Sequence, residues 1–279
     1  MIDKPTISAE HQAIANKLAS AFIDEETFPT DVVSFSEDDA FSIKRAMFRI
    51  LKTTLPEKKP MVKIIGRKIG RNDNVGLIAT PIYRQGERSS HPLPKNLIGL
   101  EPELAVVWGN ELPARIKNEK DFYQALKDVG GQLVLGVEIL ANRFQVPPLP
   151  WHEKNRPDFS IILADHLHQW GFVVGDKIET IDVARHYHQE SFAFHYGDKT
   201  IKAGSAKLAF GNPINMLWQF YQTRPFNPLT TTEQFNTGDI ITLGSLFGSA
   251  LPLTKGDVKP NDKVLFEFPG FEPLEIIWQ

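Results

Sequence analysis

Beyond residue 60 the sequence consists of short apolar runs, rich in Val, Ile and Phe and separated by Gly, Pro, Asn and Asp. Such runs are typical of β-strands, because branched and aromatic side chains pack well on a pleated surface. A hairpin turn is expected over Tyr196–Lys199, where Gly197 and Asp198 are the central residues. The pattern predicts strands near residues 61–69, 100–108, 132–140, 159–165, 171–175, 191–196, 239–243 and 263–268.

The residues before this point carry a helical pattern instead. Ser8 can cap a helix that reaches about Phe22, and Ser36 can cap a second helix, because serine oxygens accept hydrogen bonds from the first backbone amides of a helix. Apolar residues recur at helical spacing in both segments. Pro56 and Pro60 mark the end of the second helix.

Two further helices are expected within the strand-rich part. One covers about Glu119–Val129, and the other runs to about Gln222 with Asn212 as its N-cap and Pro213 in its first turn. The layout predicts an α+β fold, in which a helical segment of residues 1–60 packs on a mixed-β main domain of residues 61–279. Three polar, proline-bearing loops, 84–96, 146–157 and 223–235, are either functional lids or surface loops without a functional role.

Composition excludes several classes of protein. The net charge of −3 argues against a protein that coats nucleic acid or an anionic membrane. The absence of cysteine excludes disulfides, thiolate nucleophiles and cysteine-bound zinc, so a metal must be held by oxygen or imidazole. No glycine-rich phosphate-binding loop is present. Without a signal-peptide pattern or an apolar run of about 18 residues, we expect a cytoplasmic protein with no membrane segment.

Carboxylates occur in unusual places within the predicted strands. Glu101 and Glu103 are two residues apart, so on a strand both side chains project from one face. Two adjacent carboxylates repel each other unless solvent or a cation offsets the repulsion. The alternative is a solvent-facing edge strand, which Pro102 between them favours.

A third glutamate strengthens the interpretation of Glu101 and Glu103 as part of a cation site. Glu138 lies in a run, 133–141, that is apolar on both faces, where an unpaired charge would be costly. A basic partner in the core, Lys68 or Arg67, is the alternative. Asp165 closes the run 159–165, a position that ordinary turn chemistry also explains. Together these carboxylates are typical of a site for a hard divalent cation, Mg²⁺ or Mn²⁺.

The basic residue of most interest is Lys68, which stands two residues before Gly70 at the end of an apolar run. A lysine there could meet a substrate carboxylate or move a proton, although a lysine that merely extends to solvent is the simpler interpretation. A histidine-bound zinc site, from the pairs at 166 and 168 or at 186 and 188, is a weaker alternative because the spacing is not distinctive.

Several short motifs occur in order along the chain: Gly66-Arg-Lys-Ile-Gly70, Glu101-Pro-Glu103-Leu-Ala, Val137-Glu138, Ala164-Asp165, Gly211-Asn-Pro213, Thr237-Gly-Asp-Ile-Ile241 and Gly256-Asp257. Taken together, these motifs resemble the 2-oxopent-4-enoate hydratase family. The family lies within the fumarylacetoacetate hydrolase superfamily and includes the 2-oxohex-3-enedioate decarboxylases. The resemblance extends from about residue 8 to the end of the chain.

The resemblance implies a mixed β-sheet roll or sandwich and a metal-dependent lyase. In that interpretation Glu101, Glu103 and Glu138 bind Mg²⁺ or Mn²⁺, which chelates a small 2-oxo acid, and Lys68 and Asp165 move protons. The implied reaction is hydration of a 2-hydroxy-dienoate or 2-oxo-enoate acid to a 4-hydroxy-2-oxo acid. Decarboxylation of a 2-oxohex-3-enedioate-type diacid and C–C bond hydrolysis are alternatives. Aromatic compound catabolism and a homo-oligomer are further implications.

The sequence departs from the family pattern at positions that resemble substrate contacts. His166-Leu-His168 replaces the usual Asn-Ala-Ser after Asp165, and Thr242-Leu243-Gly244 replaces Leu-Thr-Gly. We therefore name His166, His168, Leu243 and Gly244 as candidate substrate-binding residues. A member that keeps the fold and has lost its activity is the alternative from another functional class.

Overall fold

The structure is a computed structural model. It describes residues 7–24, 26, 36–59, 63–69, 75–80, 82–84, 94–113, 116–144, 159–180, 191–197, 199–205, 213–223, 237–247, 250–253, 257–259 and 261–278. Its helices are α1 (Ala9–Asp24), α2 (Glu37–Lys58), α3 (Glu119–Asp128), α4 (Phe159–Ala164), η2 (His166–His168) and α6 (Pro213–Thr223). The predicted cap Asn212, the histidines at 186 and 188 and most of the three proline-bearing loops lie outside the described residues.

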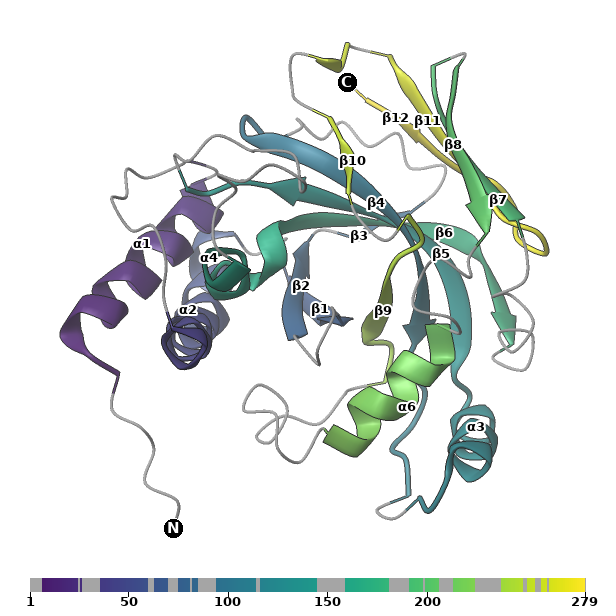
Figure 1. Ribbon diagram of the computed structural model, residues 1–279, viewed down its shortest axis with the longest axis horizontal. Helices are drawn as coiled ribbons and strands as arrows, with labels where there is room; N and C mark the ends of the chain where they lie inside the picture. The colour runs from purple at the N-terminus through teal and green to yellow at the C-terminus, as the bar shows by residue number, and fades with distance from the viewer. Residues whose placement is uncertain are drawn as a thin grey trace.

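The twelve described strands form two sheets, drawn in Figure 1. The larger sheet has the order β2-β1-β9-β4-β5-β6-β3, with β10 paired to β4, and the smaller sheet has the order β12-β11-β7-β8. The strands are β1 (Lys63–Ile69), β2 (Val75–Thr80), β3 (Ile82–Arg84), β4 (Leu97–Val107), β5 (Gln132–Ala141), β6 (Gln169–Thr180), β7 (Ser191–Tyr196), β8 (Lys199–Ser205), β9 (Ile240–Ser245), β10 (Leu251–Pro252), β11 (Lys263–Glu267) and β12 (Leu274–Ile277).

The larger sheet is curled into a roll. Strand β2, near one end of the strand order, also contacts β6, near the other end, so the sheet almost closes on itself. Parallel and antiparallel pairs coexist in it, because β1 runs parallel to β9 while β4 runs antiparallel to both β5 and β9. The predicted α+β fold with a mixed sheet roll is confirmed.

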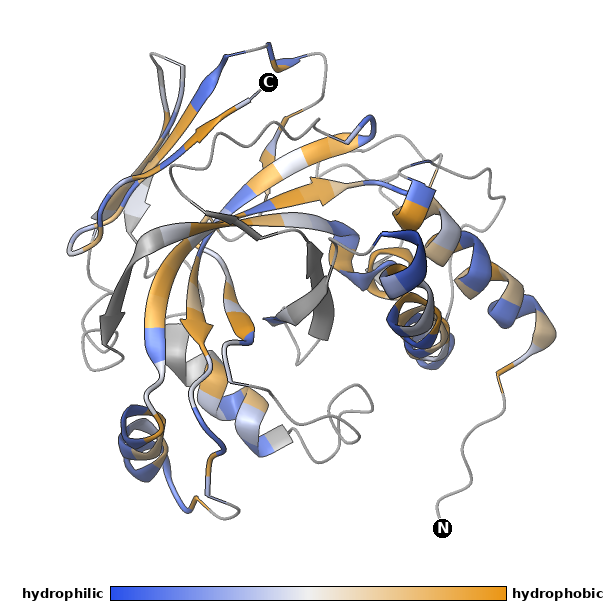
Figure 2. Cartoon of the chain, turned by 180° about the vertical axis from the view of Figure 1, so that it is seen from behind, coloured by the Kyte–Doolittle hydropathy of each residue, from blue (hydrophilic) through white to orange (hydrophobic). Residues whose placement is uncertain are grey.

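Alternation along the strands gives the roll an outer and an inner face. Leu104, Leu135 and Leu243 belong to a large apolar cluster that joins the outer face to the smaller sheet. Ala105, Val134 and other residues of the opposite face form a separate small cluster. Figure 2 shows hydrophobic residues running along the central strands, whereas the helices carry hydrophilic residues on one side. Both faces of β4 and β5 are therefore buried.

The N-terminal helices begin at the predicted caps. The Ser8 Oγ accepts a hydrogen bond from the His11 amide at 3.1 Å, and the Ser36 Oγ accepts one from the Asp39 amide at 3.1 Å. Helix α2 continues through Pro56 and ends at Lys58, between the two prolines predicted to stop it. Helices α1, α2 and α4 share one apolar cluster, which we call the helical layer. None of the described helices is both long and apolar enough to cross a membrane.

One predicted strand is wrong. Residues 159–165 form helix α4 and the start of a turn, and β6 begins only at Gln169. The run Ile161–Ala164 is buried entirely within the helical layer. A short run that is apolar on all sides cannot be assigned to strand or helix by periodicity, which explains the error. Strands β2, β3, β10 and β12 were not predicted, whereas the hairpin between β7 and β8 is confirmed.

A glycine lets β1 approach β9. A Cβ atom at Gly66 would lie 1.6 Å from the Ile240 carbonyl oxygen. We expect Gly66→Ala to destabilise the fold by about 2–3 kcal/mol, because backbone rather than a movable side chain blocks the methyl group. Urea denaturation checks this against Gly130→Ala, which meets no neighbour and costs only the strain of its positive φ of 78°. Equal costs in the two variants would contradict the close approach.

Candidate metal centre

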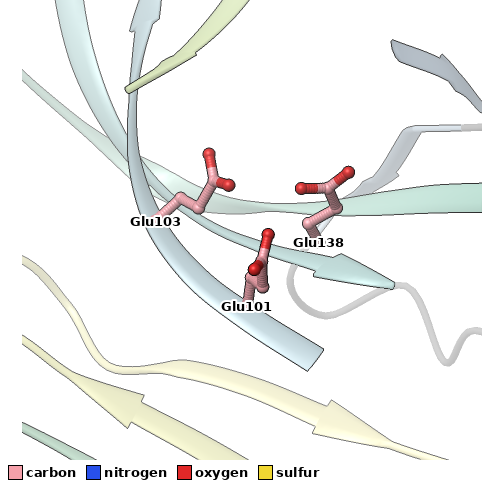
Figure 3. Close-up of side chains that lie close together, drawn as sticks. All are labelled: Glu101, Glu103 and Glu138. Carbon is pink, nitrogen blue, oxygen red and sulfur yellow. The ribbon is translucent and has the colours of Figure 1, made fainter. Parts of the chain in front are cut away.

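Three glutamates converge inside the roll. Glu101 lies directly opposite Glu138 in the register of β4 and β5, and Glu103 lies opposite Gly136, so all three side chains project from the same face. Each glutamate offers a carboxylate oxygen within 4.8 Å of those offered by the other two. Figure 3 shows the three carboxylates directed toward one another. The two-residue spacing thus predicted their common face correctly.

These carboxylates are not on a solvent-facing edge. Strand β4 pairs with β5 on one side and with β9 and β10 on the other, and Glu103 and Glu138 have no exposed surface. The edge-strand alternative suggested by Pro102 is therefore wrong. The Pro102 carbonyl accepts a hydrogen bond from the Leu246 amide, so the missing proline N–H faces the connection between β9 and β10, where no ladder bond is lost.

A buried lysine contacts two of the three glutamates. The Lys68 Nζ lies 2.9 Å from Glu101 Oε2 and 2.7 Å from Glu138 Oε2. Its neighbour Arg67 projects from the opposite face of β1, where its guanidinium carbon lies 5.5 Å from the Phe48 ring centroid of α2. Lys68 is thus the basic core partner of Glu138 that the sequence allowed as the alternative to a metal. An interpretation of Glu138 as a metal ligand has to account for this lysine.

The electrostatics of the centre leave it short of positive charge. Burial raises the pKa of Glu103 to about 7, and the charge of Glu101 adds to the effect although Lys68 opposes it. Burial likewise raises the pKa of Glu138 well above its ordinary value. Burial alone would lower the pKa of Lys68, but the three carboxylates together raise it well above its ordinary value. One ammonium therefore does not satisfy the three carboxylates.

The donor set fits a hard divalent cation. Three carboxylates and one ammonium leave two negative charges when all four groups are ionised. Neither oxygen of Glu103 has a hydrogen-bond partner among the described residues, although both are buried. Carboxylate oxygens are the ligands that Mg²⁺ and Mn²⁺ prefer, and a buried carboxylate without a donor is costly. Glu101, Glu103 and Glu138 are thus able to hold such an ion, with Lys68 beside it.

The pKa of Glu103 gives a prediction for the metal-free protein. Between the ordinary value of 4.5 and about 7, the folded protein binds more protons at Glu103 than the unfolded chain does. Stability should therefore fall as the pH rises from about 5 to about 7.5 in EDTA. Saturating Mg²⁺ should remove this fall, because a cation favours the ionised carboxylate. Melting temperatures across this range, with EDTA or Mg²⁺, check the prediction, and identical pH profiles would contradict it.

Asp165 belongs to a different group of side chains. Its Oδ1 lies 2.5 Å from the Arg143 Nε, and its Oδ2 lies 2.8 Å from the His168 Nδ1. Arg143 also donates to the carbonyls of Asp165 and Gln169, at 3.2 and 2.8 Å. His166, Leu167 and His168 all have positive φ, an unusual run for residues other than glycine. The structure thus places the predicted proton-transfer residue Asp165 in an ion pair with Arg143.

The turn of His166–His168 nevertheless lies near the same end of the roll as the acidic centre. It directly precedes β6, and it contacts β2, whose Gly76 is opposite Lys68 in the register. His166 and His168 are buried. The described hydrogen bonds and ion pairs of Asp165 and His168 do not reach the three glutamates or Lys68. Their roles toward a substrate stay predictions.

The predicted residue Leu243 of β9 points away from the centre. The Leu243 side chain is 1% exposed and lies in the outer apolar cluster, and Gly244 has a φ of 90°. Thr242 faces the glutamates instead, since it lies opposite Lys68 and Ala105 in the register and is fully buried. The sequence reasoning missed Thr242 and Arg143. The alternation along 239–243 could have indicated Thr242, whereas nothing local indicated Arg143.

Fold and site together define a class of protein: a curled mixed sheet that carries three converging glutamates and a lysine on its inner face. The sequence matches no protein-family model and no curated protein. Among solved structures, 4-oxalocrotonate decarboxylase from Pseudomonas putida G7, complexed with magnesium and adipate, aligns with 99% of this chain and 100% of its own. Its TM-score is 0.69 and its sequence identity 16%.

A second structure of that enzyme, complexed with calcium and acetate, aligns over the same shares with a TM-score of 0.68 and 16% identity. These likenesses concern the fold. They confirm, at that level, the resemblance that the ordered motifs indicated, and they cover the helical segment as well as the sheets.

Proposed function

We propose that this protein is a divalent-metal-dependent lyase that acts on a small 2-oxo acid. The observation that carries the proposal is the set of three converging, buried carboxylates with a single lysine, which leaves two negative charges. The two solved structures of 4-oxalocrotonate decarboxylase, which has the same fold, contain magnesium or calcium, which supports the same assignment. A member without activity is less favoured, because buried charges that bind no ligand would destabilise the fold without serving a function.

Glu101, Glu103 and Glu138 would hold the ion. When bound, Mg²⁺ or Mn²⁺ supplies Lewis-acid stabilisation of negative charge that develops on the substrate oxygen. Lys68 would donate a hydrogen bond to the substrate from its position 2.9 Å from Glu101. Neutralising the carboxylates removes the interactions that raise the pKa of Lys68, while its burial still lowers that pKa. Lys68 then comes nearer the range in which it gives and takes a proton.

Asp165 would act differently from a free acid. Because Arg143 holds it in an ion pair at 2.5 Å, we assign it to orienting the His168 imidazole. The two histidines and the backbone of Leu243 and Gly244 remain candidates for substrate contact. The predicted cytoplasmic location, the homo-oligomer and a role in aromatic compound catabolism belong to the proposal in the same way.

Hydration of a 2-hydroxy-dienoate or 2-oxo-enoate acid is the first candidate reaction. The described inner-face residues beside the glutamates include the apolar Ala105, Val134 and Phe172, which suit a substrate tail that lacks a second carboxylate. Decarboxylation of a diacid is the second candidate. It is supported by the shared fold of 4-oxalocrotonate decarboxylase, whose solved complex contains the diacid adipate. Both reactions place negative charge on the same substrate oxygen.

An ultraviolet assay tests the proposal. The metal-free protein is supplied with Mg²⁺ or Mn²⁺ and 2-hydroxypenta-2,4-dienoate, and in parallel with 2-oxohex-3-enedioate. Metal-dependent loss of the dienol absorbance identifies the hydratase, and turnover of the diacid alone identifies the decarboxylase. Glu103→Gln should abolish either activity, whereas Glu272→Gln, on an exposed residue, should not change it. No turnover of either compound with metal bound would contradict both candidate reactions.

A further inference from the structure

A second group of buried charges lies in the helical layer, apart from the acidic centre. Lys44 of α2 is fully buried, and its Nζ lies 5.4 Å from the Phe41 ring centroid. Arg143, 1% exposed, follows β5, and its guanidinium carbon lies 5.1 Å from the ring centroid of Phe22 in α1. Both cations therefore sit among the aromatic side chains of the helices.

His166 shows that these cations share one neighbourhood. Its pKa lies well below the ordinary value because of burial first, and then because of the positive charges of Lys44, Arg143 and Arg67. Packing agrees with this, since Ile43 of α2 shares an apolar cluster with Phe144 and Leu167, and Arg143 pairs with Asp165, the residue before His166. We call Lys44, Arg143, Arg67 and His166 the basic cluster.

Two donors of the basic cluster have no hydrogen-bond acceptor among the described residues. The Lys44 Nζ and the Arg143 Nη1 are buried, and neither has a hydrogen-bond partner in the part of the chain that the structure describes. The Nε and Nη2 atoms of Arg143 are satisfied by Asp165 and Gln169, so Nη1 is the remaining direction of the guanidinium. A buried cationic donor without an acceptor is costly unless an anion completes it.

The negative charge of Asp165 does not fill this role. Its two oxygens are engaged by the Arg143 Nε and by the His168 Nδ1, at 2.5 and 2.8 Å. One carboxylate balances one guanidinium, and the Lys44 Nζ has no hydrogen-bond acceptor among the described residues. Burial lowers the pKa of Lys44 to about 7, so an adjacent anion is what would keep its ammonium charged at neutral pH.

We propose that the basic cluster is a binding site for a small oxyanion, a carboxylate or a phosphate, held by the Lys44 Nζ and the Arg143 Nη1 with His166 beside it. An oxyanion has several acceptor oxygens, so one ion can satisfy donors from two elements at once. Because the donors come from α2 and from the end of β5, the bound ion would fasten the helical layer to the roll. The proposal does not depend on the metal centre or on the proposed reaction.

Thermal unfolding of the full chain in EDTA tests this site. Acetate and inorganic phosphate are titrated separately, with ionic strength held constant by sodium chloride. We expect a saturable rise in melting temperature with at least one of the two ions. Lys44→Met should weaken the apparent affinity at least tenfold, whereas Lys52→Met, on an exposed position of the same helix, should leave it unchanged.

The outcomes separate cleanly. Isothermal titration of the wild-type protein with the same ions gives an independent readout, which holds even where the Lys44 variant fails to fold. An effect of phosphate without acetate, or the reverse, identifies the source of the oxyanion. Absence of saturable binding to wild type by both methods, or full retention of binding in a folded Lys44→Met variant, would overturn the proposal.

Discussion

Replacing Glu103 with glutamine is expected to stabilise the metal-free protein while it removes stabilisation by Mg²⁺ or Mn²⁺. The glutamine keeps the shape of the side chain and takes one charge out of a fully buried set. Because burial raises the pKa of Glu103 to about 7, its ionisation at neutral pH opposes folding. We expect the variant to gain about 1–3 kcal/mol in EDTA at pH 7.5.

The same substitution should lower the affinity for the cation at least about 100-fold, because it removes a direct ligand from a set of three. Melting curves in EDTA and at increasing Mg²⁺ or Mn²⁺ measure both effects on the same sample. The opposite signs matter, because a variant that is merely misfolded would lose stability in both conditions. A Glu103→Gln protein that is less stable in EDTA and still stabilised by metal would contradict this account of the centre.

Replacing Lys68 with methionine is expected to have the largest effect on the metal-free fold. Lys68 is the cation that contacts Glu101 and Glu138, at 2.9 and 2.7 Å, and its removal leaves three buried carboxylates close together without this cation. Breaking a buried ion pair on one side costs about 3–5 kcal/mol. Much of this cost should be recovered at high Mg²⁺, because a divalent cation would replace the missing charge.

Urea denaturation with EDTA and with Mg²⁺ checks this second expectation. Lys120→Met, an exposed lysine of α3, is the matched control and should change stability by less than about 0.5 kcal/mol. Activity gives a separate readout, since a Lys68→Met protein that is folded in Mg²⁺ should still lack turnover. A loss of stability that is small, or that Mg²⁺ does not reduce, would mean that the lysine and the cation do not share these carboxylates.

The acidic centre could be predicted from the sequence because it depends on a local pattern, the alternation of side chains along a strand. Strand residues two apart share a face, so Glu101 and Glu103 had to project from the same face. The apolar residues on both sides of Glu138 made a charge at that position unusual. The contact of Lys68 with Glu138 was predicted as an alternative to a metal, and the structure confirms this contact, whereas a metal at the same carboxylates stays a prediction. That Lys68 and the glutamates lie together depends on the curl of the sheet.

Other parts depended on contacts that no local pattern encodes. The apolar run that ends at Asp165 becomes a helix because it packs under α2 in the helical layer, a tertiary effect that overrides its strand-like composition. The Arg143 side chain finds Asp165 across 22 positions of sequence. Pro102 suggested an edge strand because its missing N–H was expected to remove a hydrogen bond between paired strands. In the structure this position faces the connection between β9 and β10 instead.

The family resemblance guided the choice of Leu243 and Gly244, and the alternation of β9 explains why Thr242 is the residue that faces the glutamates. Adjacent strand residues point to opposite faces, so a one-residue difference from the family pattern exchanges the inner side chain for an outer one. The fold implied by the resemblance is confirmed, whereas the roles that it implied for the three glutamates and for the positions where this chain departs from the family stay predictions.

We propose above that Glu101, Glu103 and Glu138 together hold a divalent cation. The most direct test is a crystal structure of the protein grown with Mn²⁺, with an anomalous difference map calculated from data collected at a wavelength where manganese scatters anomalously. The account predicts one strong peak among the three carboxylates, with Lys68 beside it. A map with no peak there, and with the Lys68 ammonium still joining Glu101 to Glu138, would contradict it.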